Sequence, residues 1–148
     1  MTKREIELFL LNYPAMTDYL VNLRESILHG GRTFTFSRSG YTGSYSDTTA
    51  KRAVRLVEIS TLEKVLSLIG QWIENELQPK CRPVLIDRWR GYTWPVIAKR
   101  RGVMIWKIIS DWEAMIIGLT KYLMHFVGTA CDLAGTVSAS GLIRRMKA

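Results

Sequence analysis

Three consecutive cations followed by a glycine are the residues of this chain best suited to binding chemistry. Lys99, Arg100 and Arg101 precede Gly102 within the stretch GYTWPVIAKRRGVMIWKIISDW, residues 91–112. Ammonium and guanidinium groups bind phosphate oxygens and release counterions, but such contacts carry no sequence information. The pattern therefore predicts binding to a polyanion such as nucleic acid.

No pattern in the chain predicts a catalytic or metal site. The sequence has no His-x-x-x-His, Cys-x-x-Cys or Asp-x-Asp spacing, and no Gly-rich loop that ends in Lys-Ser/Thr. Its two histidines, His29 and His125, stand at a helix end and near an apolar face, where histidine is usually structural. We expect no enzymatic activity, no metal and no cofactor.

The net charge of +8 lies entirely in the second half of the chain. Residues 1–79 carry nine Lys/Arg and nine Asp/Glu, whereas residues 80–148 carry twelve Lys/Arg and four Asp/Glu. This asymmetry predicts a polyanion partner for the second half and a packing or assembly role for the first. The alternative is a basic surface that is only solvated.

The bulk composition indicates a globular protein. With 148 residues, 47% of them hydrophobic, the chain forms one domain, or one domain with a helical arm. Cys81 and Cys131 are too few for a disulfide scaffold and too far apart for a metal knuckle, so both are expected to be reduced. The N-terminus does not resemble a signal peptide, and the apolar stretch 114–127 is too short to span a bilayer. We expect a cytoplasmic protein without a membrane partner.

The first half of the sequence predicts three helices. Residues 3–12 form the first, Pro14 begins the second, and His29-Gly30-Gly31 ends it. Residues 30–47 are rich in Gly, Ser and Thr and are expected to form a loop, or a small hairpin at residues 33–36. Asp47 and the threonines after it are good N-caps for a long helix over residues 48–77.

The long helix carries a continuous apolar stripe, for which two interpretations remain open. The stripe either packs against the first two helices or forms the seam of a homodimer through helix 48–77. Its members are Ala50, Ala53, Val54, Val57, Leu62, Val65, Leu66, Ile69, Ile73 and Leu77.

The second half predicts a helix-turn-helix. After a short helix that ends at Gly91, a helix over residues 93–101 has Thr93 as its N-cap and points Ile97 and Ala98 inward. Gly102 tolerates the positive φ of a turn, and a further helix runs over residues 105–122. Its buried residues are expected to be Ile108, Trp112, Met115 or Ile116, and Leu119. The predicted fold class is thus all-α: an N-terminal helical arm with one long helix (1–79), a C-terminal helix-turn-helix domain (80–123) and a basic tail (124–148). The end of the tail, with Arg144, Arg145 and Lys147, is expected to be frayed; the alternative is that these residues add phosphate contacts.

The block VLIDRWRGYTWPVIAKRRGV, residues 84–103, resembles the start of sigma-70 region-4-type helix-turn-helix domains. Their pattern is a Leu-rich helix, then Gly-x-Ser/Thr-Trp-x-x-Ile-Ala, then Gly-Val/Ile. With SDTTAKRAVRLVEISTLE before it, the chain is similar over residues 5–123 to sigma-like phage late-transcription regulators of the RinA and ArpU type. The resemblance implies a phage or prophage regulator in a bacterial host cell that binds double-stranded promoter DNA and contacts RNA polymerase.

Two positions depart from the family pattern. Arg101 stands where an apolar residue is usual, and Met104-Ile105 stand where Ser or Thr usually begins the recognition helix. The apolar residues at this helix start would meet thymine methyl groups or a base step, pack on another protein, or lie under the C-terminal tail. The candidate DNA-binding residues are Arg88, Arg90, Thr93, Trp94, Lys99, Arg100, Arg101, Met104, Ile105, Trp106, Lys107, Ile109 and Ser110.

Two other functions remain open from the sequence. One is a phage DNA-packaging adaptor like a small terminase subunit, although such proteins usually carry the helix-turn-helix near the N-terminus. The other is a helix-turn-helix that serves as a protein-interaction module.

Overall fold

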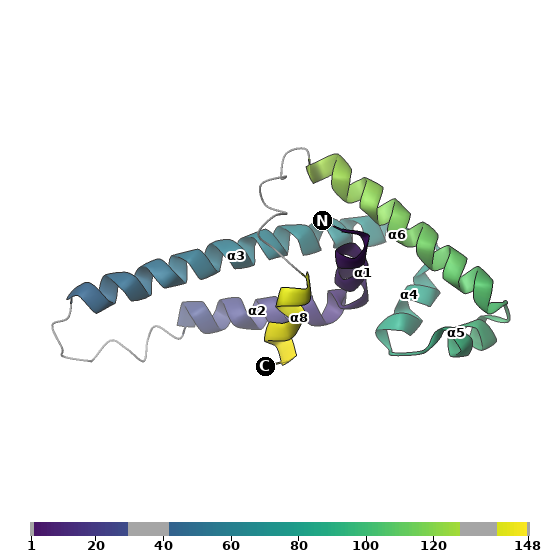
Figure 1. The fold of residues 1–148 in the computed structure, drawn as a ribbon, viewed down its shortest axis with the longest axis horizontal. Coiled ribbons are helices and arrows are strands. Elements are labelled where there is room, and N and C mark those ends of the chain that lie inside the picture. The colour runs from purple at the N-terminus through teal and green to yellow at the C-terminus, as the bar shows by residue number, and fades with distance from the viewer. Residues whose placement is uncertain (1, 30–41, 128–138, 148) are drawn as a thin grey trace.

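The structure is a computed structural model, and it describes residues 2–29, 42–127 and 139–147. These residues form helices and no strands, so the predicted all-α fold is confirmed (Figure 1). The helices are α1 (Lys3–Leu11), α2 (Tyr13–His29), α3 (Thr42–Asn75), α4 (Arg82–Trp89), α5 (Trp94–Arg101), α6 (Ile105–Val127) and α8 (Ala139–Lys147).

Helices α1 and α2 begin and end close to the predicted positions. The Thr2 side chain caps α1 by accepting a hydrogen bond from the Glu5 backbone N–H at 3.2 Å. Pro14 lies in the first turn of α2, where its missing N–H costs no helical hydrogen bond. Phe9, Leu10 and the other apolar residues on the predicted faces turn toward the interior of the protein.

Helix α3 is longer than predicted at its N-terminal end. It starts at Thr42 rather than at residue 48 and continues through Asp47, so the expected cap at Asp47 is wrong. Ser and Thr are only slightly unfavourable inside helices, and extending a helix is much easier than nucleating one. The remaining part of the predicted loop, including the hairpin alternative at residues 33–36, lies outside the described residues.

The apolar stripe of α3 divides into a buried part and an exposed part. Leu66 and Ile69 belong to the core of the single chain, so packing within the chain is the correct interpretation of this part of the stripe. Val54 and Val57 are 59% and 65% exposed. A homodimer through helix 48–77, the other interpretation of the stripe, would involve its exposed part and stays a prediction.

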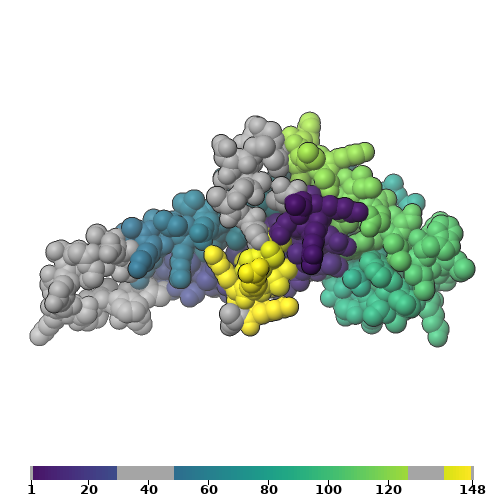
Figure 2. Space-filling view, in the orientation of Figure 1, coloured from purple at the N-terminus to yellow at the C-terminus, as the bar shows by residue number. Residues whose placement is uncertain are grey.

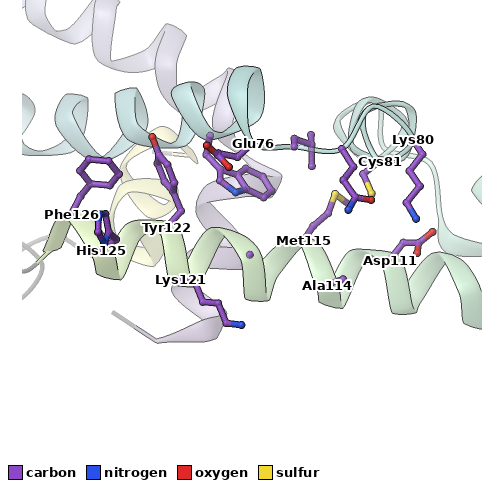
Figure 3. Close-up of a pocket in the computed structure, with 14 residues that line it drawn as sticks. Glu76, Lys80, Cys81, Asp111, Ala114, Met115, Lys121, Tyr122, His125 and Phe126 are labelled. Atoms are coloured by element: carbon purple, nitrogen blue, oxygen red, sulfur yellow. The ribbon is translucent and has the colours of Figure 1, made fainter.

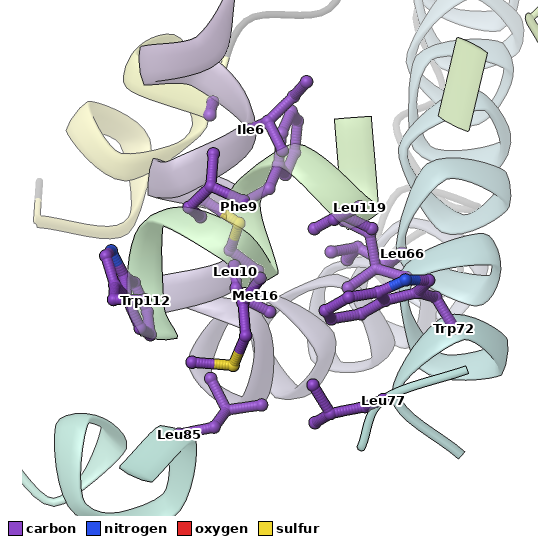
Figure 4. Packing of buried hydrophobic residues seen from close by; sticks show 14 of the residues in the cluster. Ile6, Phe9, Leu10, Met16, Leu66, Trp72, Leu77, Leu85, Trp112 and Leu119 are labelled. Carbon is purple, nitrogen blue, oxygen red and sulfur yellow. The ribbon is translucent and has the colours of Figure 1, made fainter. Parts of the chain in front are cut away.

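The core is one cluster of buried residues with members from every described helix. Figure 4 shows Phe9, Leu10 and Met16 from α1 and α2 beside Leu66 and Trp72 from α3. Trp112 of α6 is also fully enclosed, and its indole N–H donates to the Glu7 carboxylate at 2.9 Å. The basic second half is thus packed directly on the neutral first half.

The C-terminal segment contains a helix, so the prediction of a frayed tail is wrong for residues 139–147. Helix α8 packs against α1 and α2, and Ala139 and Leu142 are buried. Glu5 of α1 accepts hydrogen bonds from the Ala139 N–H at 2.6 Å and the Ser140 hydroxyl at 3.2 Å. Because a carboxylate at a helix N-terminus satisfies free N–H groups, Glu5 of α1 caps the N-terminus of α8.

Candidate nucleic-acid interface

Helices α4, α5 and the start of α6 form one end of an elongated molecule (Figure 2). Helix α4 has Pro83 in its first turn, and Gly91 follows it with a φ of 86°. Helix α5 begins after Thr93, as predicted, although the Thr93 side chain makes no capping hydrogen bond. Helix α6 continues beyond residue 122 to Val127, because residues 122–127 contain neither Gly nor Pro to end it.

The junction between α5 and α6 has the predicted turn at Gly102. Gly102 has a φ of 66°, and the Val103 N–H donates to the Ala98 carbonyl oxygen at 3.1 Å. Ile97 and Ala98 are buried, which allows α5 to cross close to α6. The turn therefore fixes the angle at which the start of α6 projects from the protein.

One face of α6 is anchored in the core, as the sequence predicted. Trp94 of α5 packs edge-on against Trp112, with ring centroids 5.4 Å apart. The residues expected to be buried on α6 are all buried: Ile108, Trp112, Met115, Ile116 and Leu119.

The first turn of α6 presents apolar side chains to solvent. Met104 and Trp106 are 67% and 68% exposed, and Ile105 and Ile109 are also exposed. Lys107 and Ser110 are exposed on the same helix. Residues 139–147 pack against α1 and α2, so the expectation that the C-terminal tail hides these side chains is wrong for that segment. The apolar helix start is available for contact with another molecule.

The three consecutive cations are not equivalent. The Asp87 carboxylate of α4 is completely buried, and it accepts a hydrogen bond from Arg101 at 2.9 Å. Arg100 lies 3.9 Å from the same carboxylate oxygen and stacks over Tyr92, with its guanidinium carbon 4.7 Å from the ring centroid. The structure gives Lys99 no ion pair with any described residue. Of the run, Lys99 is the cation least engaged within the protein.

Arg88 also has partners inside the protein. Its guanidinium carbon lies 4.1 Å from the Trp94 ring centroid, and the guanidinium donates to the Tyr92 carbonyl oxygen at 3.1 Å. Arg88 and Trp94 thus hold the turn between α4 and α5. Arg90 and Thr93 are exposed around the same turn.

Sequence reasoning missed the role of Asp87. Two signals pointed to it: Asp87 is one of four acidic residues in the basic half, and Arg101 stands at a position that is usually apolar in the similar family. A buried carboxylate needs a positive partner because an isolated buried charge is very costly. Arg101, at a position where the family usually has an apolar residue, is that positive partner of Asp87.

A separate cavity of about 790 Å³ lies between the end of α3 and the middle of α6 (Figure 3). Tyr122 and Phe126 line one end, and Cys81 and Asp111 line the other. Burial of the Cys81 thiol raises its pKa above the usual value, and the nearby Asp111 carboxylate raises it further, whereas Lys80 lowers it. Cys81 is therefore a protonated, poorly nucleophilic thiol at neutral pH.

Within residues 2–29, 42–127 and 139–147, no group of three or more His, Cys, Asp or Glu residues is placed to hold a metal ion. No helix in these ranges is long and apolar enough to cross a membrane.

Comparisons of the chain with protein-family models, with curated proteins and with solved structures found no match.

Proposed function

We propose that this protein binds double-stranded DNA through α4, α5 and the start of α6, and that it regulates transcription as a phage- or prophage-encoded factor. In this proposal α5 and α6 act as a helix-turn-helix, and α6 enters the major groove. The regulator would act in a bacterial host and contact RNA polymerase, as the resemblance of residues 84–103 to sigma region 4 implies.

The observation that carries the proposal is the exposed start of α6 after the Gly102 turn. The opposite face of this helix is locked in the core by Ile108 and Trp112, so its first turns form a rigid projection. A recognition helix needs this arrangement because its N-terminal residues contact the bases while its body is fixed by the domain.

Phosphate contacts in this proposal come from the cations that have no partner among the described residues. Lys99 at the end of α5, Lys107 on α6 and Arg90 after α4 are exposed and form no ion pair with any described residue. The first N–H groups of α6 add a favourable site for a phosphate because Met104 has no side-chain oxygen to cap them. Arg100 and Arg101 chiefly hold α5 against Asp87.

Base contacts would be apolar. Met104, Ile105, Trp106 and Ile109 offer no pair of hydrogen-bond donors for guanine, but they fit against thymine methyl groups or partly insert at a flexible base step. Discrimination would then favour sites rich in A·T pairs or flexible pyrimidine–purine steps.

Two substitutions test this division of roles. After selection of bound fragments from a randomised duplex pool, Trp106→Ala should lower the preference for selected over random DNA by about 1–3 kcal/mol and leave the salt dependence unchanged. Lys99→Ala should weaken binding to both DNAs equally and reduce the slope of log K against log[salt] by about 1. Equal effects of the two substitutions on the salt slope would contradict the proposal.

A protein-interaction module is the second candidate, and the exposure of Met104 and Trp106 favours it specifically. Large exposed apolar groups gathered on one helix end are typical of protein-binding surfaces. If this is the function, Trp106→Ala should leave DNA binding unchanged and weaken capture of a purified partner such as RNA polymerase.

A further inference from the structure

Helix α6 is apolar on its outer side as well as on the side that faces the core. Ile117 and Met124 are 50% and 69% exposed. Ala114, which lies between Trp106 and Ile117 in the sequence, is also exposed. Residues 110, 117 and 124 follow one another at intervals of seven, the spacing of a helix-pairing seam. Figure 1 shows that α6 forms an outer edge of the molecule.

The charges on this face are arranged symmetrically around Ile117. Glu113 precedes Ile117 by four residues, and Lys121 follows it by four residues, so both lie on the same side of the helix as Ile117. The Glu113 side chain is 46% exposed, and Lys121, which borders the cavity, projects away from α3 in Figure 3. In an antiparallel pair of such helices, Glu113 of each copy lies opposite Lys121 of the other.

We propose that a second copy of this chain docks on the outer face of α6, with the two helices antiparallel and Ile117 on the two-fold axis. A symmetric dimer buries the same patch twice, and the patch must therefore be complementary to itself. The acidic and basic residues at equal distances from Ile117 meet this condition. An unrelated partner would not require that symmetry, and a membrane surface would not favour Glu113 beside the apolar residues.

The pairing leaves the start of α6 free. In this register Ser110 lies opposite Met124 of the second copy, whereas Trp106 lies beyond the end of the second copy's α6 at Val127. Each Trp106 is eleven residues from the axis, so the two helix starts are about 33 Å apart at 1.5 Å per residue. One turn of B-DNA is about 34–36 Å. This consequence for DNA rests on the proposed function, but the dimer itself does not.

Sedimentation velocity of the full chain tests the dimer, and two matched substitutions locate it. The unmodified protein should sediment as a concentration-dependent dimer, and Ile117→Arg should sediment as a monomer with unchanged helical circular dichroism. Val57→Arg, on the exposed part of α3, should remain dimeric. A monomeric unmodified protein, a dimeric Ile117→Arg variant, or loss of the dimer in Val57→Arg alone would each overturn the proposal.

Charge exchange gives a second test that does not depend on Ile117. Glu113→Lys and Lys121→Glu should each weaken self-association about tenfold, because each places like charges across both symmetric contacts. An equimolar mixture of the two variants should form a heterodimer, since opposite charges then face each other again. Failure of the mixture to associate would refute the antiparallel register.

Two controls separate the loss of self-association from loss of the Lys3–Glu113 ion pair and from loss of DNA binding. Glu113 also forms an ion pair with Lys3 of α1 within the chain, so Lys3→Ala should leave self-association unchanged. Binding of each variant to a single DNA half-site should be retained if the proposed function holds. A dimer without DNA binding would contradict the proposed function only, and DNA binding by a strictly monomeric protein would contradict the dimer only.

Discussion

The buried carboxylate of Asp87 determines what the neighbouring arginines can do. Arg101 donates to it directly, and Arg100 lies within ion-pair distance of the same oxygen. Removing a partner from a buried charge costs more than a surface ion pair contributes, because the remaining charge loses its compensation. The run of three cations therefore combines a structural clamp with one solvent-facing lysine.

Arg101→Ala should accordingly destabilise the fold by about 1–3 kcal/mol, measured as a shift of the urea midpoint with an unchanged m-value. Lys99→Ala, at an exposed position two residues earlier, serves as the control and should change stability by less than about 0.5 kcal/mol. If the two variants unfold at the same urea concentration, Asp87 does not depend on Arg101.

Cys81 gives a prediction from its raised pKa. The thiolate is the reactive form, so burial should make Cys81 react with iodoacetamide more slowly than an exposed cysteine at pH 8. Asp111→Asn removes one of the two causes that raise this pKa, and it should speed alkylation. The measurement is made in a Cys131→Ser background so that only one thiol reports. An unchanged or slower reaction of Asp111→Asn would show that the carboxylate does not act on the thiol.

At the scale of the helices, α8 is expected to be an integral part of the fold. Leu142 is buried against α1 and α2, and Leu142→Ala should lower the free energy of unfolding by about 2–5 kcal/mol. Arg144→Ala on the exposed side of the same helix is the matched control and should have almost no effect. Similar urea midpoints for Leu142→Ala and the unmodified protein would mean that α8 is detached in solution.

Periodic burial explains which helices could be predicted from the sequence. The second-half helices were recognised because Ile97, Ala98 and the core residues of α6 repeat at three- and four-residue intervals between clear stop signals. Helix α8 was missed because the residues before Leu142 are small and show no helical period, and because the Glu5 carboxylate that caps it is more than a hundred residues away in the sequence. Local patterns cannot reveal a cap that arrives through tertiary packing.

The same distinction applies to the candidate interface. Once Ile108 and Trp112 are assigned to the core, helical spacing places Met104, Trp106 and Ile109 on the exposed side. The exposure of these apolar side chains could therefore be predicted from the sequence. The two sequence signals for the Arg101–Asp87 ion pair were not sufficient to predict it, because the contact depends on the angle between α4 and α5 that brings Asp87 within reach. DNA binding itself remains a prediction.

For the whole molecule, the central question is whether the basic half binds DNA through one end of the protein or only through its net charge. The elongated shape separates the α4–α6 end from the α2–α3 hairpin at the other end (Figures 1 and 2). Exposed cations lie both at the α4–α6 end and along α3, so the same charge can be removed from either place: Arg90, Lys99 and Lys107 at the α4–α6 end, and Lys51, Arg55 and Lys64 along α3.

The most direct test is the equilibrium affinity for a random-sequence duplex over a series of salt concentrations. The unmodified chain should bind at low salt with a slope of log K against log[salt] of about −3, because three phosphate contacts each release a counterion. Replacing Arg90, Lys99 and Lys107 by alanine should abolish most of this slope, whereas replacing Lys51, Arg55 and Lys64 should leave it nearly unchanged. Equal losses from the two triple variants, or no binding by the unmodified chain at low salt, would contradict DNA binding through the α4–α6 end.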